Sequence, residues 1–205
     1  MNMTFRRARP EDDLQAADLI YSAGPAAIEY AFATRKHRAI DFIRWAFRDG
    51  SGVIGFRNHR AAIVDGRVAG IGAFYSADEF ERLSRMMVWQ IIRFYGVFKS
   101  PGVLKRAARL EAITPRPGRD ALFIQNLGVA AGMRGRGIGS RLLEDQIRAA
   151  RSQKLRRCIL DVAADNTRAR KLYERLGFCM VARQNWPFQD DPVHVPDHIR
   201  MELIL

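Results

Sequence analysis

The sequence predicts a mixed α/β fold, and three observations indicate it. Apolar runs that are typical of strands alternate with segments whose apolar residues recur at helical spacing, which is the pattern of a sheet covered by helices. An Asp-Gly pair at residues 65–66 lies between the apolar runs 60–64 and 67–74, and this is a strong signal for a hairpin of two adjacent strands. A glycine-rich turn at residues 132–139 joins the apolar run 121–129 to an amphipathic helical pattern.

Length and composition suit one domain. The 205 residues are 48% hydrophobic, which is enough to bury a core, and we expect residues 1–205 to form a single domain. No apolar run approaches the roughly 20 residues of a membrane-spanning helix. The first residues lack the apolar stretch of a signal peptide, so we expect a cytoplasmic protein.

The charge balance of the chain is strongly basic. A formal net charge of +12 favours anionic partners, among them phosphate-bearing ligands and nucleic acid. Arg greatly outnumbers Lys, however, and an arginine-rich surface that reflects genome composition is the commoner explanation. Nucleic acid or a membrane surface is therefore not expected as the main partner.

Neither the cysteines nor the histidines indicate a metal site. Cys158 and Cys179 lie in apolar stretches without C-x-x-C spacing, so we expect buried, reduced thiols. His194 and His198 have i, i+4 spacing, but Pro196 between them argues against a helical pair of ligands. We therefore expect no bound metal.

The chain begins with a strand and three helical segments. Residues 4–8 are predicted to form the first strand. A helix is expected from Pro10, because proline and the acids that follow it suit a first helical turn, and Gly24 ends it. Two further helical segments are predicted at 25–32 and 37–47, the second with imperfect apolar periodicity.

Residues 77–120 form a basic segment that is predicted to be helical. Its apolar residues recur at near-helical spacing, and a structureless loop of this length is implausible. One interpretation is a basic amphipathic helix pair for a membrane surface or nucleic acid. The other is a helical cap whose apolar face packs on the domain or on a partner subunit. Packing is the commoner fate of such a stripe, so we expect the cap.

The glycine-rich turn is predicted to bind an anion. Gly135, Gly137 and Gly139 remove the side chains that would keep a ligand away from the backbone. The N–H groups at the start of the following helix are unpaired and carry the positive end of its dipole, which suits a phosphate. Neither the Rossmann spacing of glycines nor the Gly-Lys-Ser/Thr of a P-loop is present.

The remainder of the chain supplies three strands and a helix. Residues 158–162 are predicted to be a strand, and 165–167 can cap the helix that follows. Gly177 is placed as the residue that ends this helix. Residues 178–183 and 198–205 are predicted to form the last two strands.

Two blocks of the sequence resemble the GNAT superfamily of N-acyltransferases. Arg134-x-x-Gly137-x-Gly139, which follows a strand, is similar to the acetyl-CoA signature of that family, Arg/Gln-x-x-Gly-x-Gly/Ala. Residues 161–178 resemble its second block, which is Asn, then Ala, then Leu-Tyr, then Leu-Gly-Phe. The resemblance implies a central, mostly antiparallel sheet of about six to seven strands flanked by helices. Residues 77–120 would then be a helical insertion between the third and fourth strands.

The same resemblance implies a binding site for acetyl-CoA as cosubstrate. The residues that it assigns to this site are Leu127, Gly128, Val129, Arg134, Gly135, Arg136, Gly137, Ile138, Gly139, Ser140 and Asn166. The Val129 amide would face the thioester oxygen, and Asn166 would touch the pantetheine, although it could instead be only a helix cap. Tyr173 would be catalytic and would face the sulfur, although it could instead be only part of the core.

The acceptor side is less well defined by the sequence. Many relatives keep a Glu or Asp on the fourth strand, but this chain has Gln125 and Asn126 there, and neither can act as a base. Candidate substrate contacts are Glu29, Tyr30 and Asp41 on the early helices, and Asp190, Asp191 and Asp197 with Trp186 or Phe188 in the loop between the last strands. The loop acids would attract a cationic amine and the aromatic rings would offer it a cation–π face. Exposed polar positions and a solvated turn are the alternatives.

Together these features predict an acetyl-CoA-dependent N-acetyltransferase that acts on a primary amine of a small molecule or protein, by direct attack in a ternary complex. The alternative from another class is a GNAT-fold module that binds acyl-CoA as a sensor or scaffold without turnover. The missing acid favours that alternative, and the retained Tyr173 disfavours it. The expected partners are acetyl-CoA and the amine, and a homodimer stays open.

Overall fold

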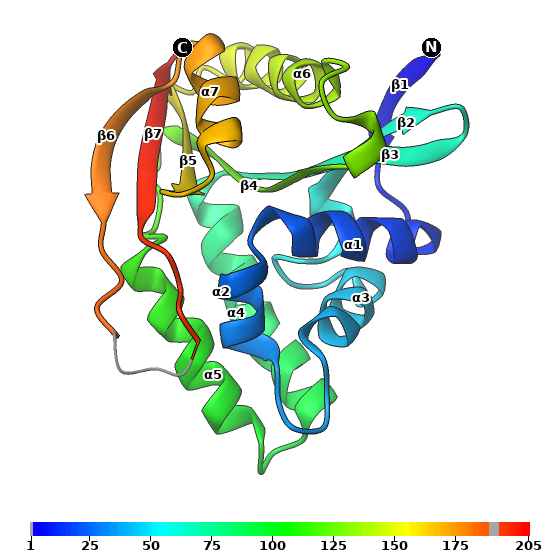
Figure 1. Cartoon of the computed structure of the whole chain (residues 1–205), viewed down its shortest axis with the longest axis vertical. Coiled ribbons are helices and arrows are strands. Elements are labelled where there is room, and N and C mark those ends of the chain that lie inside the picture. The colour runs from blue at the N-terminus through cyan, green and yellow to red at the C-terminus, as the bar shows by residue number, and fades with distance from the viewer. Residues whose placement is uncertain (1, 189–192) are drawn as a thin grey trace.

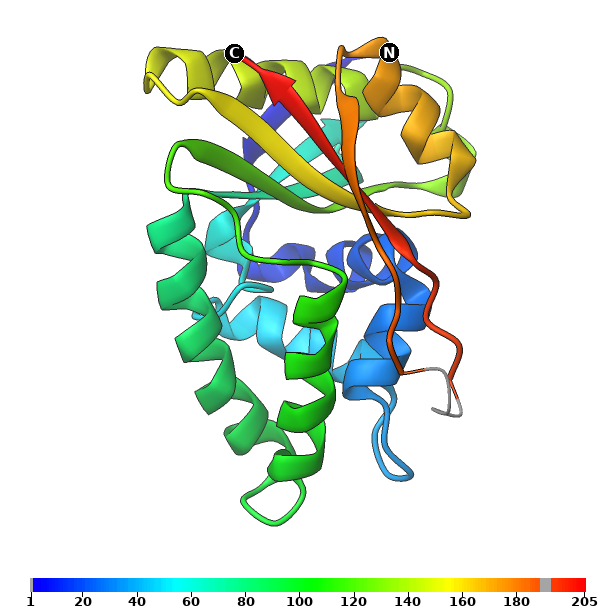
Figure 2. The same ribbon diagram turned by 90° about the vertical axis from the view of Figure 1, so that its left-hand side faces the viewer.

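The computed structural model of the chain describes residues 2–188 and 193–205. A seven-stranded sheet forms the middle layer, and helices cover both of its faces (Figures 1 and 2). The strands are β1 (Met3–Arg7), β2 (His59–Val64), β3 (Arg67–Tyr75), β4 (Ala121–Val129), β5 (Arg157–Ala163), β6 (Cys179–Gln184) and β7 (His198–Ile204). The α-helices are α1 (Asp13–Ala23), α2 (Pro25–Phe32), α3 (Ala39–Asp49), α4 (Ala77–Tyr95), α5 (Ser100–Arg109), α6 (Ile138–Ser152) and α7 (Thr167–Arg175).

The sheet is mostly antiparallel, as predicted. Its strand order is β1-β2-β3-β4-β5-β7-β6, and β4 and β5 are the parallel pair. The predicted hairpin joins β2 to β3 through Asp65 and Gly66, which have φ angles of 48° and 78°. Positive φ at both central residues is what a two-residue turn of this hand requires, and Asp-Gly adopts it readily. The fold class predicted from the sequence is therefore confirmed.

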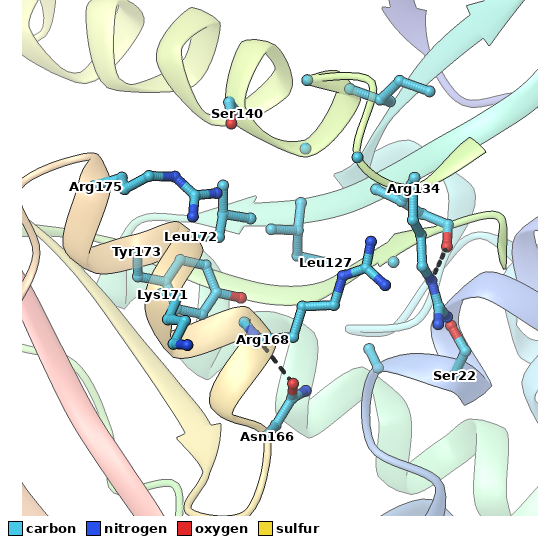
Figure 3. Close-up of a pocket in the computed structure, with 18 of the residues that line it drawn as sticks. Ser22, Leu127, Arg134, Ser140, Asn166, Arg168, Lys171, Leu172, Tyr173 and Arg175 are labelled. Carbon is cyan, nitrogen blue, oxygen red and sulfur yellow. Dashed lines mark hydrogen bonds between the residues drawn. The ribbon is translucent and has the colours of Figure 1, made fainter. Parts of the chain in front are cut away.

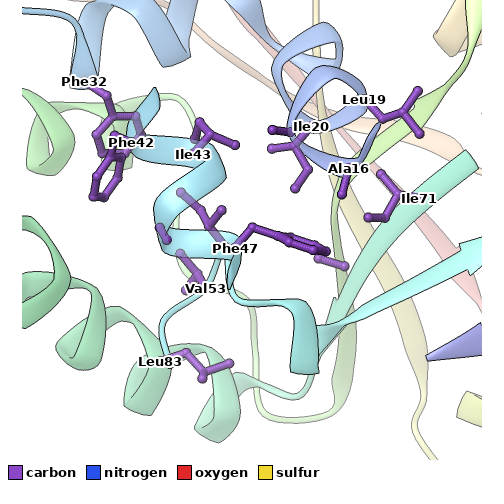
Figure 4. Packing of buried hydrophobic residues seen from close by; sticks show 14 of the residues in the cluster. Ala16, Leu19, Ile20, Phe32, Phe42, Ile43, Phe47, Val53, Ile71 and Leu83 are labelled. Carbon is purple, nitrogen blue, oxygen red and sulfur yellow. The ribbon is translucent and has the colours of Figure 1, made fainter. Parts of the chain in front are cut away.

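The two faces of the sheet carry different sets of helices. Helices α6 and α7 lie on one face, and α1 to α5 lie on the other (Figures 1 and 2). Under α6 and α7, Leu143 and Ile147 pack with residues of β4 and β5. On the opposite face, Phe42 and Phe47 of α3 are completely buried in one cluster with Ile20 of α1 (Figure 4). Burying each such side chain contributes roughly 1.5–3 kcal/mol of transfer free energy.

The predicted insertion is a helical hairpin, α4 and α5, that packs on the core. Helix α4 begins with a capping box, in which the Glu79 N–H donates to Ser76 Oγ and the Ser76 N–H donates to the Glu79 carboxylate at 2.9 Å. Leu83 and Ile91 of α4 and Val103 of α5 are buried in the same cluster as α1 and α3. The apolar stripe of this segment therefore serves the core, as expected for a cap.

A β-bulge interrupts β4 near its end. The register between β3 and β4 shifts between Ile71 and Ala73, and Asn126 has a left-handed φ of 56°. Gly128 is required there, because a β-carbon would overlap the Leu19 carbonyl group of α1. The pairing of β4 with β5 runs only to Ile124, so beyond that residue the two strands are no longer hydrogen-bonded to each other.

The two cysteines differ from the prediction in one respect. Cys158 lies in β5, in the middle of the sheet, and is buried as expected. The expectation was wrong for Cys179, whose side chain is exposed. Strand β6 is the last strand of the sheet and most of its residues are accessible, so an apolar run there does not imply burial. Within residues 2–188 and 193–205, none of the helices combines the length and the hydropathy that crossing a membrane requires.

Candidate functional site

A cavity of about 650 Å³ lies where the end of β4, the glycine-rich turn, the start of α6 and helix α7 meet (Figure 3). We call it the glycine-turn cavity. It is lined by Ser22, Ala23, Leu127, Gly128, Val129, Met133, Arg134, Gly135, Gly137, Ile138, Gly139, Ser140, Asn166, Thr167, Arg168, Ala169, Lys171, Leu172, Tyr173 and Arg175. Two sequence blocks that are far apart along the chain thus form a single hollow, as the family resemblance implied.

The turn exposes backbone donors to this cavity. Gly135 and Gly137 have φ angles of 81° and 77°, and nothing lies within 4 Å of a β-carbon built on either of them. Gly137 precedes α6 without any side-chain cap, so the first N–H groups of the helix are not satisfied by a capping side chain. The positive end of the α6 dipole is therefore available to an anion from the cavity.

The two arginines of the turn occupy different positions. Arg134 Nε donates to the Val129 carbonyl oxygen at 3.0 Å, which folds this side chain back along the wall of the cavity. Arg136, which the sequence also assigned to the site, is exposed and is not part of the lining. Of the two guanidinium groups, that of Arg134 is the one positioned at the cavity.

Helix α7 brings further cations that the sequence analysis did not single out. Arg168, Lys171 and Arg175 all line the glycine-turn cavity, and Figure 3 shows the Arg168 side chain extending into it. Their spacing of three and four residues places them on one face of the helix. This spacing was the signal in the sequence, and it was obscured because the whole chain is rich in arginine.

Asn166 has a structural partner as well as a position at the cavity. Its Oδ1 accepts a hydrogen bond from the Ala169 N–H at 3.1 Å and so caps α7. The predicted alternative of a helix cap is therefore real, but it uses only the oxygen. The Asn166 amide nitrogen has no hydrogen-bond partner among the described residues, and this residue lines the cavity.

Tyr173 lies partly in the core and partly at the cavity. Its ring packs with Phe178 at a centroid distance of 5.9 Å, and the residue is 7% exposed. The hydroxyl makes no hydrogen bond to a described residue, and Figure 3 shows it pointing into the cavity. Burial raises the pKa of Tyr173 well above its usual range, so the hydroxyl stays protonated and is a hydrogen-bond donor.

The substrate contacts predicted on the early helices, Glu29, Tyr30 and Asp41, do not line this cavity. Glu29 accepts a hydrogen bond from the Tyr21 hydroxyl at 2.8 Å and lines a separate surface groove with Asp41. Tyr30 is 3% exposed, and its hydroxyl accepts from Arg109 Nη1 at 2.9 Å. Neither residue lines the glycine-turn cavity.

The loop between β6 and β7 packs on the helices. Trp186 is buried and meets the Tyr30 ring edge-on at 5.0 Å, and Arg109 covers the Phe188 ring at 4.3 Å. Both rings therefore contact residues of this chain, Trp186 with Tyr30 and Phe188 with Arg109. Asp197 accepts from the Trp186 N–H at 3.0 Å and pairs with Arg183. The predicted contacts Asp190 and Asp191 lie outside the described residues.

A second cavity of about 330 Å³ lies on the opposite face of β4, and we call it the apolar cavity. Residues of α1 to α5 line it, and most of its lining is apolar. Gln125 and Asn126 of the β4 bulge form part of its wall, and Ala23 at the end of α1 lines both cavities. His198 also lines it, a residue that the sequence analysis had considered only as a metal ligand. Among the described residues, no group of His, Cys, Asp and Glu side chains is arranged to hold a metal ion.

Comparison with known proteins decides the family of the chain. Residues 17–178 match the Acetyltransferase (GNAT) family. The chain belongs to this family. The match includes both sequence blocks and every residue that lines the glycine-turn cavity. A comparison with curated proteins gave no match.

Several solved structures share the fold of this GNAT protein. One is an N-acetyltransferase from Staphylococcus aureus Mu50, with a TM-score of 0.71 and 20% identity over 98% of this chain and 100% of that chain. A polyamine N-acetyltransferase from Drosophila melanogaster has a TM-score of 0.59 and 16% identity, and 100% of each chain is covered. A ribosomal-protein-alanine N-acetyltransferase from Brucella melitensis has a TM-score of 0.57 and 20% identity over 98% of this chain and 99% of that chain. At these identities the likeness is one of fold.

Proposed function

We propose that this chain is an N-acetyltransferase that moves the acetyl group of acetyl-CoA to the nitrogen of a primary amine while both substrates are bound. The observation that carries the proposal is the glycine-turn cavity. This cavity extends from the uncapped start of α6 to the end of β4, beyond the point where β4 and β5 stop pairing. The chain that contains it belongs to the GNAT family.

The residues around the cavity suit the phosphates of acetyl-CoA. The open space in front of Gly135 and Gly137 lets a phosphate oxygen approach the backbone N–H groups of the turn. Arg134, Arg168 and Lys171 add positive charge around the same space. In this proposal Leu127, Gly128 and Val129 lie beside the pantetheine arm, and the free amide nitrogen of Asn166 donates to it.

The geometry of β4 also supports an oxyanion contact. The Ala130 N–H donates to the Ala69 carbonyl oxygen, which makes Val129 and Gly70 a pair that is not hydrogen-bonded to each other. The Val129 N–H therefore points away from β3, toward the side on which β5 has separated. A preorganised amide donor of this kind stabilises the negative charge that develops on a thioester oxygen, and such donors supply a large share of catalysis.

The proposed reaction forms a bond between the amine nitrogen and the acetyl carbon and breaks the bond from that carbon to sulfur. The nitrogen loses a proton and the leaving sulfur needs one or a strong hydrogen bond. Because the pKa of Tyr173 is raised, its hydroxyl suits hydrogen-bond donation to the sulfur better than full proton transfer. Gln125 and Asn126 cannot take the proton of the amine, so it leaves to a group other than a β4 carboxylate.

The absence of an acid at Gln125 and Asn126 favours a second candidate, a protein that binds acyl-CoA without turnover. Release of free thiol separates the two. The protein is incubated with acetyl-CoA and a panel of primary amines, and thiol is followed over time with a chromogenic disulfide. Turnover that depends on the amine supports the transferase. Tight binding of coenzyme A without any thiol release would leave the sensor as the function.

A further inference from the structure

The apolar cavity lies against the same strand as the proposed acetyl-CoA site. Gln125 and Asn126 of the β4 bulge face the apolar cavity, while the next residues, Leu127 to Val129, face the glycine-turn cavity. Ala23 belongs to both linings. The bulge is thus a shared wall, and it lies at the point where β4 no longer pairs with β5. A ligand in the apolar cavity would therefore lie across this bulge from the proposed acetyl-CoA site, close to the end of β4.

The insertion supplies much of the apolar lining of this cavity. Phe80 and Met87 of α4 and Leu104 and Ala107 of α5 line it, together with Ile28 of α2. A cavity of about 330 Å³ lies at the lower end of the range for small-molecule sites. Its walls offer an apolar surface to the body of a ligand. Polar residues line it on β4, β5 and β7, and also at Ser84, Glu111 and Thr114.

Both carboxylates that line this cavity have an arginine partner. Asp161 makes two hydrogen bonds with Arg200, at 2.9 and 2.7 Å, and its side chain is 2% exposed. Glu111 pairs with Arg116 at 3.4 Å. A second cationic group on the ligand would therefore find no unpaired carboxylate in the described lining. Burying such a charge without a partner is costly, which disfavours diamines.

The polar residues that line the cavity from the strands suit an uncharged amine. His198 Nδ1 lies 3.0 Å from the Pro196 carbonyl oxygen, so this nitrogen carries the hydrogen and donates. Nε2 is then a hydrogen-bond acceptor, and it has no partner among the described residues. Burial lowers the pKa of His198, which keeps the ring neutral. Gln125 and Asn126 of β4 line the same cavity and carry amide groups that can also accept a hydrogen bond.

We infer that the apolar cavity is the acceptor site and that it selects monoamines with an apolar body, aryl or branched alkyl, over amines that carry a second charge. This inference rests on the proposed transferase function and names its substrate class. The groove that contains Glu29 and Asp41 is the rival site, but it includes no residue of β4 and none of the glycine-turn cavity.

The test compares phenethylamine, an aryl monoamine, with the diamine putrescine in the thiol-release assay. The aryl amine should have a kcat/KM at least about tenfold higher, as expected for a hydrophobic pocket that gains a well-packed apolar group. Ala107→Leu fills the cavity and should weaken the apparent affinity for phenethylamine, with a rise in its KM of about tenfold or more. Ala112→Leu is the matched control, because Ala112 is exposed in the same segment and does not line the cavity. The KM for acetyl-CoA should be unchanged in both variants.

A second variant keeps the test decisive should Ala107→Leu fail to fold. Ser84→Asp places an unpaired carboxylate at the cavity from α4 and should shift the preference toward putrescine. Thiol release that favours the diamine in the wild type, with amine KM values unaffected by Ala107→Leu and Ser84→Asp, would overturn the inference and leave the transferase intact. An absence of thiol release with every amine would overturn the proposed function itself and the acceptor site with it.

Discussion

Gly139 lies in the first turn of α6 at the wall of the glycine-turn cavity, and its replacement by Glu tests the anion site directly. A β-carbon there would lie 3.4 Å from a Leu172 methyl carbon and 3.5 Å from a Val129 methyl carbon, which is ordinary contact. The fold should therefore tolerate a side chain. The carboxylate, however, would lie beside a bound phosphate. Two like unit charges at ~4 Å repel by about 1 kcal/mol in water and by about 4 kcal/mol at the effective dielectric of a protein surface.

This repulsion corresponds to a loss of coenzyme A affinity between about fivefold and about a thousandfold. Calorimetric titration of coenzyme A into Gly139→Glu measures the loss, and Gly139→Ala is the matched control, because it adds the β-carbon without the charge. Circular dichroism establishes that both variants are folded. A folded Gly139→Glu protein that binds coenzyme A as tightly as the wild type would refute the assignment of an anion to the start of α6.

Three further predictions concern Tyr173, the cations of α7 and the buried His59. Tyr173→Phe removes only a hydroxyl, so steady-state kinetics should show kcat lower by about 100-fold with the acetyl-CoA KM unchanged, and wild-type turnover would return Tyr173 to a packing role. Arg168→Ala and Lys171→Ala should each weaken coenzyme A binding, with a loss that shrinks as ionic strength rises. A loss that is independent of salt would contradict a charge contact. Burial lowers the pKa of His59 to about 4, whereas the unfolded residue titrates near 6.5, so stability should fall by about 3 kcal/mol as pH drops through this window. Urea unfolding of His59→Gln should lack that part of the pH dependence, and identical pH profiles for the two proteins would exclude it.

The fold and the turn that forms the proposed cosubstrate site could be predicted because their signals are local. Glycines at 135, 137 and 139 beside a helical pattern identify an uncapped helix start wherever it occurs in the fold. The Asp-Gly turn at 65–66 needs only its own two residues to fix a hairpin. Such features depend on neighbours in the chain, and the structure has the hairpin turn and the uncapped helix start at these positions.

The proposed acceptor side could not be predicted in the same way, because it depends on packing between distant segments. Tyr30 has an ordinary helical position, and only the approach of Arg109 and Trp186 decides that it is buried. Trp186 was expected to offer its ring to a cationic amine. Its burial against Tyr30 depends on the packing of two distant segments, which the sequence does not show. The apolar cavity combines residues from α1 through β7, and none of these segments carries a motif of its own. For His198 in particular, no motif in the surrounding sequence indicates that it lines a cavity.

The helical hairpin between β3 and β4 also has a consequence for the order of folding. Pairing these strands closes a loop of residues 76–120, and this costs about 2 kcal/mol more entropy than a tight four-residue turn would. Helices and their contacts form locally within microseconds, so α4 and α5 can shorten this loop before the strands meet. We therefore expect β4 to dock late, after the hairpin has reached the core through Leu83 and Ile91. The wall between the two cavities would then be among the last parts of the molecule to form, which ties the appearance of the site to the completion of folding.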